Sequence, residues 1–228
     1  MHVPNGFFDV PTSVATGVVA VAGVAVALRG ARRELDDKTA PMAGLVATFV
    51  FAGQMMNFPV GAGTSGHLLG GALAAVLAGP WTAVLCISVV LGVQALFMAD
   101  GGITALGTNI TLMGLVGVAV AWLVFRGVQA VLPNRLSMVA PAAAVAAFVS
   151  VPVVALAFTG LFAIGGTAPV AMDDVLVAMV GWHTLIGIGE AIITGLVVAS
   201  VVAVRPDLVY GARPALRERP LEIRTAVP

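Results

Sequence analysis

The chain has 228 residues, of which 60% are hydrophobic and only 10% charged, and its formal net charge is zero. A mean hydropathy of +1.07 lies well outside the range of soluble globular proteins, so we interpret the chain as an integral membrane protein. The zero net charge and the lack of a soluble-looking domain argue against nucleic acid as a partner. The single cysteine, Cys86, excludes an intrachain disulfide and a cysteine-based metal cluster.

Met1 and His2 form a candidate metal-binding terminus. When the α-amine is free, a histidine at position 2 can offer one metal ion three nitrogens, namely the amine, the deprotonated amide of His2 and its Nδ1. These donors close two fused chelate rings and occupy three corners of a square, so one corner stays open. Ni(II) or low-spin Co(II) accepts such a square of nitrogen ligands better than Zn(II) or Mg(II) does. On its own, a histidine at this position is more often accidental than a ligand, so the prediction depends on the rest of the chain.

The terminus is expected to stay intact. No Lys or Arg precedes the first apolar stretch, so the chain lacks the charged region that begins a secretory signal peptide. A bulky residue such as His2 directly after the initiator also favours retention of Met1. The sequence therefore predicts a free amine on Met1.

Apolar runs separated by short polar breaks predict seven transmembrane helices. In chain order they cover residues 12–29, 40–57, 66–79, 81–99, 104–131, 137–164 and 172–204. The third is short, and the glycine-rich stretch 61–66 before it predicts a non-helical loop that dips into the protein. Only Gly79 and Pro80 separate the third helix from the fourth. So short a break is possible because proline suits the first turn of the helix that follows. The predicted fold is an all-α polytopic membrane protein with one transmembrane domain, 1–204, and a basic cytoplasmic tail, 205–228.

The positions of the basic residues predict the orientation. With seven crossings and an outer N-terminus, the inner segments are 30–39, 79–80, 126–136 and the tail. All 11 basic residues fall in these segments or at their edges: Arg29, Arg32, Arg33, Lys38, Arg126, Arg135, Arg205, Arg213, Arg217, Arg219 and Arg224. The positive-inside rule therefore places the N-terminus outside and the C-terminus in the cytoplasm. The outer segments are then the N-terminus, 57–66, 100–102 and 165–173.

His67 lies at the predicted start of the third helix, on the same face as the amino terminus. A lone histidine near a helix start is usually a hydrogen-bonded structural residue. Together with Met1 and His2, it would supply the open fourth corner of the square. Metal-bound histidines normally have their other ring nitrogen held by a polar group. The candidates for such support at this level are Asn57, Thr64, Ser65 and Asn109.

Several stretches of the sequence resemble one known family. They are MHVPNGF (1–7), QMMNFP (54–59) running into GTSGHLLGG (63–71), ADGG (99–102) and GWHTLIGIGEA (181–191). Across residues 1–210 they make the chain similar to the CbiM/NikM family. In that family the metal is held in a square plane by the terminal amine, the backbone nitrogen and imidazole of the second residue, and the histidine of GTSGH. The resemblance implies that Met1, His2 and His67 are the ligands here. Asn5 stands where the family commonly has aspartate. This difference argues against a charged contact from this loop to the site, but it does not affect the metal ligands.

The resemblance also implies a function. Members of the family are the substrate-capture subunits of energy-coupling-factor transporters for cobalt or nickel. The chain would then capture Co(II) or Ni(II) with high affinity in the cytoplasmic membrane, without enzymatic activity and without a permanently bound cofactor. The implied partners are a transmembrane coupling protein, two cytoplasmic ATPases, often a small additional membrane subunit, and the lipid bilayer. The chain has no Walker-type nucleotide motif, so the energy must come from these partners. Because the nitrogen ligands must lose protons, capture should weaken as the pH falls.

Two residues of the last predicted helix have open roles. Glu190 lies well inside the helix, and an intramembrane carboxylate is a functional candidate by default. It could support the metal ligands, act as a coupling element, or be neutral and hydrogen-bonded in the core, and we favour the last two. His183 lies in the outer half of the same helix and is expected to be structural or to support the ligands.

Three other functions are alternatives. A membrane b-type haem protein could use His67 and His183 as axial ligands, and a Soret band would reveal it. Ser65 and His67 loosely resemble the nucleophile loop of a hydrolase. Two residues apart at a helix start, however, they would point in different directions. A stand-alone channel would transport the metal equally well without the ATPases.

Overall fold

The structure is a computed structural model that describes residues 1–37, 39–61 and 64–217. Its helices are α1 (Val10–Glu34), α2 (Ala40–Gln54), α3 (Gly71–Ala78), α4 (Pro80–Phe97), α5 (Leu106–Asn109), α6 (Gly117–Val131), α7 (Val139–Gly165), α8 (Met172–Val204) and α9 (Arg213–Arg217). A π-helical segment, η1 (Ile110–Val116), joins α5 to α6, and 3-10 turns precede α7 and follow α8. Two short strands, β1 (Phe58–Gly61) and β2 (Thr64–Gly66), pair antiparallel. The predicted all-α fold is confirmed.

Five helical segments are long and apolar enough to cross a membrane. They are α1, α4, the continuous segment from α5 to α6, α7 with the turn before it, and α8. Helix α2 is apolar but shorter, with 15 residues. Helix α3 has only 8 residues, so at 1.5 Å per residue it is about 12 Å long and covers less than half of the hydrocarbon layer. The chain is a polytopic membrane protein, while seven crossings and an outer N-terminus stay predictions.

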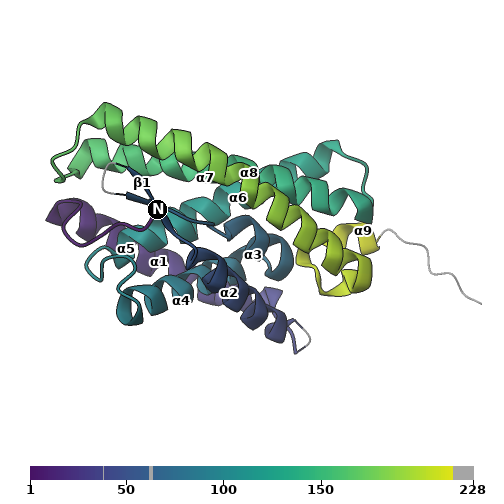
Figure 1. Cartoon of the computed structure of the whole chain (residues 1–228). Helices are drawn as coiled ribbons and strands as arrows, with labels where there is room; N and C mark the ends of the chain where they lie inside the picture. Colours follow the sequence, from purple (N-terminus) through teal and green to yellow (C-terminus); the bar gives the residue numbers. More distant parts are fainter. Residues whose placement is uncertain (38, 62–63, 218–228) are drawn as a thin grey trace, which may run out of the picture.

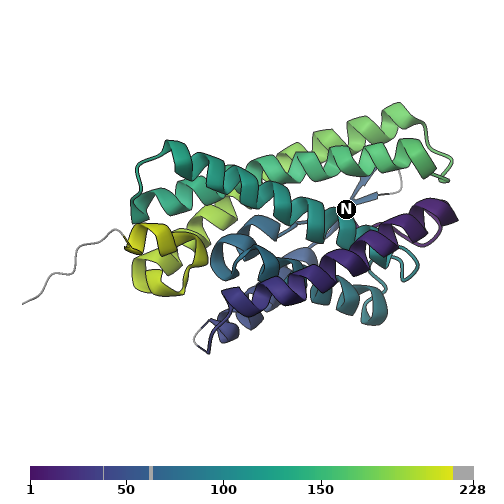
Figure 2. The ribbon, with the colours of Figure 1, turned by 180° about the vertical axis from the view of Figure 1, so that it is seen from behind.

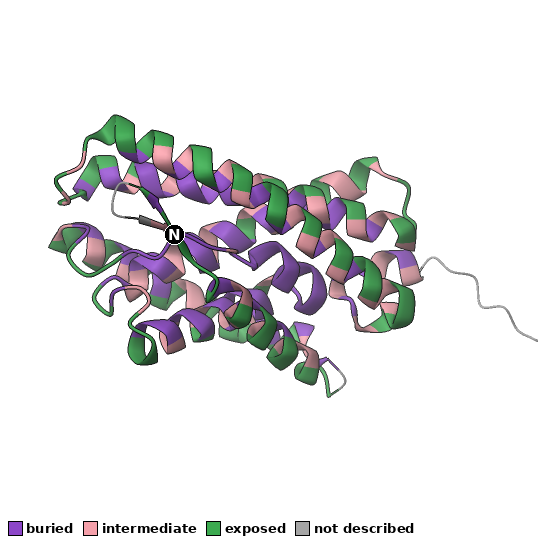
Figure 3. Cartoon of the chain, in the orientation of Figure 1, coloured by how far each residue is buried: buried purple, intermediate pink, exposed green. Residues whose placement is uncertain are grey.

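Helix α3 lies in the middle of the bundle (Figure 1). Helices α7 and α8 run side by side along one edge, and α6 packs against α7. Helices α1, α2 and α4 form the opposite side, and α1 is the nearest of them to the viewer when the molecule is turned round (Figure 2). All residues of α3 are buried, whereas the outer helices expose one face (Figure 3). Those exposed faces carry large apolar side chains such as Val21, Leu123 and Leu185, as lipid contact requires.

The third predicted helix, 66–79, is wrong at its start. Residues 58–66 form a hairpin in which Phe58 pairs with Gly66 and Pro59 pairs with Ser65, and α3 begins only at Gly71. Pro59 has no N–H with which to continue α2, and glycines such as Gly61, with φ +100°, permit the tight return of the chain. His67 therefore lies in the connection between the hairpin and α3, and not at a helix start.

The predicted break at Gly79 and Pro80 is confirmed. Helix α3 ends at Ala78, and α4 begins at Pro80. The buried carboxylate of Glu34, at the end of α1, accepts hydrogen bonds from the N–H groups of Trp81 at 3.2 Å and Thr82 at 2.7 Å. These amides belong to the first turn of α4, where no carbonyl within the helix can bind them. Glu34 thus caps α4.

The first part of the tail packs against the helices. Val209 and Ala212 are completely buried, and Arg213 Nη2 donates a hydrogen bond to the carbonyl oxygen of Glu34 at 3.2 Å. Apolar burial accounts for this packing, since a solvated tail would leave these side chains in water. The parts of the inner segments and the tail that lie outside the described residues are Lys38 and 218–228, with Arg219 and Arg224.

Candidate metal centre

The N-terminal peptide runs through the interior of the protein (Figure 1). Met1 and Val3 are completely buried, and His2 is 5% exposed. Asn109, at the end of α5, binds both backbone groups of Val3. The Val3 N–H donates to Asn109 Oδ1 at 2.8 Å, and Asn109 Nδ2 donates to Val3 O at 3.2 Å. Val3 O also accepts a hydrogen bond from the Gly102 N–H at 2.8 Å. Asn109 and Gly102 together satisfy a peptide that has no helix or strand of its own, and they fix the course of residues 1–3.

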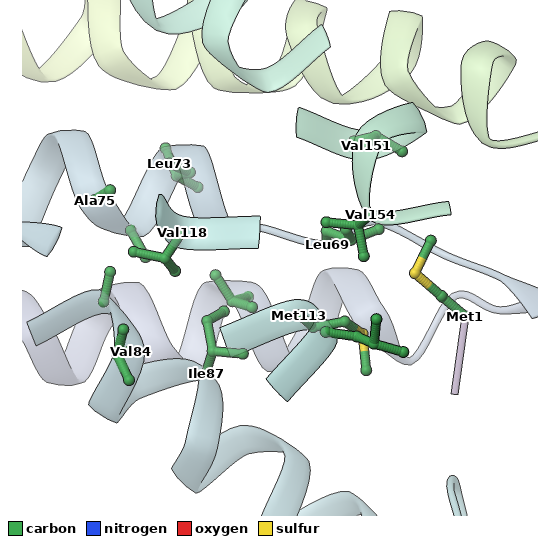
Figure 4. Packing of buried hydrophobic residues seen from close by; sticks show 14 of the residues in the cluster. Met1, Leu69, Leu73, Ala75, Val84, Ile87, Met113, Val118, Val151 and Val154 are labelled. Carbon is green, nitrogen blue, oxygen red and sulfur yellow. The ribbon is translucent and has the colours of Figure 1, made fainter. Parts of the chain in front are cut away.

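The Met1 side chain anchors the terminus. It lies at one end of the buried apolar cluster that also contains Leu69, Val151 and Val154 (Figure 4). Full burial of a methionine side chain contributes about 1.5–3 kcal/mol. The anchor holds the terminal amine at a defined place inside the protein.

Asn5 holds the next part of the peptide. Its Oδ1 accepts hydrogen bonds from the Thr104 N–H at 3.0 Å and from Thr104 Oγ1 at 2.8 Å. Gly6 follows with φ +71°, a conformation that suits glycine and turns the chain toward α1. An amide oxygen suffices as acceptor for both bonds, so this role of residue 5 needs no negative charge.

His2 and His67 lie face to face. Their ring centroids are 4.2 Å apart, and the ring planes differ by 21°. His67 Nδ1 lies 2.8 Å from Leu68 O, which assigns the proton to Nδ1 and leaves a lone pair on Nε2. Within the described residues, Nε2 of His67 and Nε2 of His2 are buried without a hydrogen-bond partner, whereas His2 Nδ1 faces the carboxylate of Asp100. Such orphaned nitrogens are uncommon in folded proteins, and they suit a site that binds a metal through nitrogen.

The terminal amine of Met1 lies against the hairpin. It donates a hydrogen bond to Ser65 O, and Ser65 Oγ is 3.4 Å away. Burial lowers the pKa of the amine from 8.0 to about 4, and the negative charge of Asp100 opposes this shift only in part. The amine is therefore neutral at neutral pH and carries the lone pair that a metal ligand needs.

The environment also keeps His67 neutral. Burial is the largest cause and lowers the pKa of its imidazole well below the usual value, and a positive charge on the terminal amine, His2 or His183 would lower this pKa further. The hydrogen bond to Leu68 O opposes the shift without reversing it. Since metal ions bind the neutral imidazole, no proton has to leave His67 at neutral pH.

Asp100 is a site residue that the sequence prediction missed. Its Oδ1 lies 2.9 Å from His2 Nδ1, an ion-pair distance without the alignment of a hydrogen bond. Its Oδ2 accepts a hydrogen bond from Asn57 Nδ2 at 3.0 Å. Burial raises the pKa of Asp100, but His2, Asn57 and the terminal amine lower it more, so the net pKa is below the usual value. The available signal was an acidic residue in the ADGG loop, on the same predicted face as both histidines.

Three of the four residues that were predicted to support the ligands make hydrogen bonds or close contacts at this site. Ser65, Asn57 and Asn109 contact the amine, Asp100 and Val3 respectively, as described above. Thr64 lies in β2 by its backbone, and its side chain is outside the described part of the chain.

His183 is completely buried in α8 and does not join the His2 and His67 stack. Its Nδ1 lies 2.7 Å from Met179 O, one turn earlier in the same helix. A positive charge on its ring would lower the pKa of His67, so the two rings are close enough to interact electrostatically. The ring of His67 stacks on His2, and its Nδ1 is hydrogen-bonded to Leu68 O. These contacts argue against a catalytic pair of Ser65 as nucleophile and His67 as base.

The buried amine makes the stability of the metal-free protein depend on pH. In the unfolded chain the amine has a pKa of 8.0, and in the folded chain about 4. Between these values the unfolded state binds more protons, so stability rises with pH, by at most about 1.4 kcal/mol per pH unit. We expect the apparent Tm of the metal-free protein in detergent to rise from pH 6.5 to pH 8. This range lies above the usual pKa of histidine, so titration of histidines in the unfolded chain contributes little to the change. A Tm that stays constant over this range would contradict a buried neutral amine.

Loss of the Asn109 side chain should weaken metal binding. Asn109→Ala removes both hydrogen bonds that Asn109 makes to Val3 and keeps the one from the Gly102 N–H to Val3 O, so the peptide that carries the amine and His2 is held less firmly. Residues that support metal ligands typically cost about 10–100-fold in affinity when they are replaced, and we expect a loss of this size in a Ni(II) titration. The control is Asn134→Ala, at an exposed position between α6 and α7. Equal affinities for the two variants would show that Val3 needs no support from Asn109.

Comparison with known proteins gives consistent matches over nearly the whole chain. A family described as the cobalt uptake substrate-specific transmembrane region matches residues 2–208. A putative metal transport protein of Haloquadratum walsbyi is 36% identical over 212 residues, which cover 92% of this chain and 94% of that protein. The fused nickel transport protein NikMN of Rhodobacter capsulatus is 36% identical over 236 residues, 98% of this chain and 68% of that protein. The cobalt transport protein CbiM of Sorangium cellulosum is 33% identical over 211 residues, 91% and 94% of the two chains.

Solved structures give the same picture. The crystal structure of a truncated transition metal transporter matches with a TM-score of 0.83 and 29% identity, and the match covers 89% of this chain and 99% of that one. A second structure, of a transition metal transporter, matches with a TM-score of 0.82 and 30% identity, and covers 90% and 93% of the two chains. The overall fold of the chain is therefore similar to that of these transporters.

Proposed function

Because the chain belongs to the CbiM/NikM family of cobalt and nickel transport proteins, we propose that it is the substrate-capture subunit of an energy-coupling-factor transporter in the cytoplasmic membrane. The proposed substrate is Co(II) or Ni(II), bound by the amino terminus and His67. The chain is a membrane transport protein and not an enzyme, which favours this function over the haem protein considered above.

One observation carries the proposal of the site. The neutral amine of Met1, the ring of His2 and Nε2 of His67 are buried together, and within the described residues Nε2 of His67 lacks a hydrogen-bond partner while Nδ1 of His2 contacts only Asp100. With the backbone nitrogen of His2, they amount to four nitrogen donors. A square of four nitrogens favours Ni(II) and low-spin Co(II) over ions that prefer oxygen ligands or tetrahedral sites.

Capture requires three local changes. The amine exchanges its contact with Ser65 O for the metal, and Nδ1 of His2 exchanges its contact with Asp100 for the metal. The amide of His2 loses its proton to close the two chelate rings. Asp100 stays close to the site, where its negative charge offsets part of the charge of a divalent cation.

Transport into the cytoplasm is proposed to depend on partners. These are a transmembrane coupling protein, two ATPases that supply the energy, and an additional small membrane subunit. The length of the fused nickel transport protein NikMN supports an additional subunit, since this chain covers only 68% of that protein. The large apolar faces of the outer helices offer contact surfaces for lipid and for membrane partners.

The experiment compares uptake of radioactive Ni(II) or Co(II) by cells that contain this chain with and without the coupling protein and the ATPases. The expected result is sustained uptake only when all partners are present and the ATPases are active. An ATPase variant without its P-loop lysine serves as the control for expression of the complex. Undiminished uptake by this chain alone would contradict the proposal and favour the stand-alone channel.

A further inference from the structure

Two buried polar side chains hold the backbone directly after His67. Glu190 of α8 is 1% exposed and Gln54 of α2 is completely buried. Glu190 Oε2 accepts a hydrogen bond from the Leu69 N–H at 2.7 Å, and Oε1 accepts one from the Gly70 N–H at 2.8 Å. Gln54 Nε2 donates to Leu69 O at 2.8 Å. Side chains from two membrane helices therefore bind both backbone groups of Leu69.

This part of the chain depends on such contacts. Residues 67–70 connect β2 to α3 and belong to neither element. Gly70 takes φ +78°, and a Cβ at this position would lie 2.7 Å from the Val50 side chain of α2. With no ladder of backbone hydrogen bonds, the path of the segment is set by the groups that bind its amides and carbonyls.

The hydrogen bonds form a continuous path to the ring of His67. Leu68 O and the Leu69 N–H belong to the same peptide group. His67 Nδ1 donates a hydrogen bond to the oxygen of this peptide group. The N–H of the same peptide group donates a hydrogen bond to Glu190. A carboxyl acceptor on the N–H polarises the peptide and strengthens its oxygen as an acceptor. A stronger acceptor on Nδ1 fixes the tautomer and the ring orientation, and it makes Nε2 a better ligand.

We propose that Glu190 positions His67 for the metal ion through the Leu68–Leu69 peptide group, with Gln54 holding the same segment from α2. This inference rests on the proposed function of His67 as a ligand. Glu190 is a positioning residue, because its contacts are with the backbone and not with the metal. Its burial inside a membrane helix is explained by these bonds to the Leu69 and Gly70 amides, which lie directly before α3.

The test is a titration of the purified full-length protein with Ni(II) alone, followed by absorption. Glu190→Gln keeps the size of the side chain but replaces one of the two acceptor oxygens with an amino group that cannot bind a backbone N–H. We expect Ni(II) binding to weaken about 10–100-fold and the spectrum of bound Ni(II) to move toward that of His67→Ala. Unchanged affinity and an unchanged spectrum would overturn the inference.

The matched control is Glu34→Gln. Glu34 is also a buried carboxylate that accepts hydrogen bonds from two backbone amides, but these belong to Trp81 and Thr82 in the first turn of α4. Both variants should lower the Tm of the metal-free protein, and only Glu190→Gln should change the Ni(II) spectrum. If Glu34→Gln changes the spectrum as much, the effect of Glu190 is one of general stability and the inference fails.

A double variant separates positioning from additive damage. In the His67→Ala background, Glu190→Gln should cause no further loss of Ni(II) affinity, because the residue that it positions is absent. An equal loss in both backgrounds would overturn the inference. Gln54→Met removes the donor to Leu69 O from the other side and should show the same dependence on His67, so it replaces Glu190→Gln if that variant does not fold.

The two proposals can fail separately. If His67→Ala binds Ni(II) with unchanged affinity and spectrum, the proposed ligand set is wrong. If His67→Ala weakens binding but Glu190→Gln and Gln54→Met do not, only the positioning role is wrong.

Discussion

Replacement of His2 with glutamine is expected to remove high-affinity binding of Ni(II). The variant keeps a bulky second residue, which favours retention of Met1 and leaves the terminal amine in place. It removes the imidazole nitrogen, and with it the second chelate ring that stabilises the deprotonated amide. Residues that only support a ligand cost about 10–100-fold in affinity. Loss of this ligand should therefore weaken binding by more than about 100-fold.

The measurement is a Ni(II) titration of the purified protein in detergent. The control for changes near the terminus is Asp9→Asn, because Asp9 caps α1 through the Thr12 N–H at 2.8 Å and asparagine retains an acceptor oxygen. The control should bind Ni(II) as the unaltered protein does. If His2→Gln also binds with unaltered affinity, the terminal chelate is not the metal site.

Replacement of His67 with alanine is expected to weaken Ni(II) binding and to change its coordination. Three nitrogens of the terminus remain, so the variant should still bind Ni(II), with an affinity lower by about 10–100-fold or more. Water would occupy the fourth corner, and the site would lose its all-nitrogen square plane. Since square-planar Ni(II) is diamagnetic and Ni(II) with more ligands is paramagnetic, absorption and magnetic measurements detect the change.

His183→Ala is the matched control for His67→Ala. Both histidines are buried, and both use Nδ1 on a backbone carbonyl and leave Nε2 without a partner in the described residues. Only His67 stacks on His2, so only its loss should remove the square-planar spectrum. A spectrum that survives His67→Ala and disappears in His183→Ala would assign the fourth corner to the other histidine.

Hydropathy predicts six of the seven helical segments of this protein. Helices in lipid must be apolar over most of their length, so these six coincide with the observed helices to within five residues, whereas the third was predicted to begin at 66 and begins at Gly71. The hairpin at 58–66 was beyond this reasoning, because its pairing of Phe58 with Gly66 and Pro59 with Ser65 depends on backbone geometry and not on hydropathy. The glycine-rich sequence indicated only that this region is not helical.

The candidate site divides in the same way. Met1, His2 and His67 could be proposed from the sequence because their chemistry is specific and they match a long motif. The contacts of Asn109 with Val3 and of Glu190 with Leu69 could not, since they join a side chain to a backbone amide 106 and 121 residues away. Every residue except proline has such an amide, so the sequence marks neither partner. Only the packing of α5 and α8 around the N-terminal peptide and α3 shows which groups meet.

A free amine on Met1 is the central requirement of this account, and a removable N-terminal fusion tests it most directly. The fusion is designed so that cleavage leaves Met1 as the first residue, and the same purified protein is titrated with Ni(II) before and after cleavage. We predict weak binding without a square-planar spectrum before cleavage, and tight binding with that spectrum afterwards. Equally tight binding with the same spectrum before cleavage would contradict the proposed site.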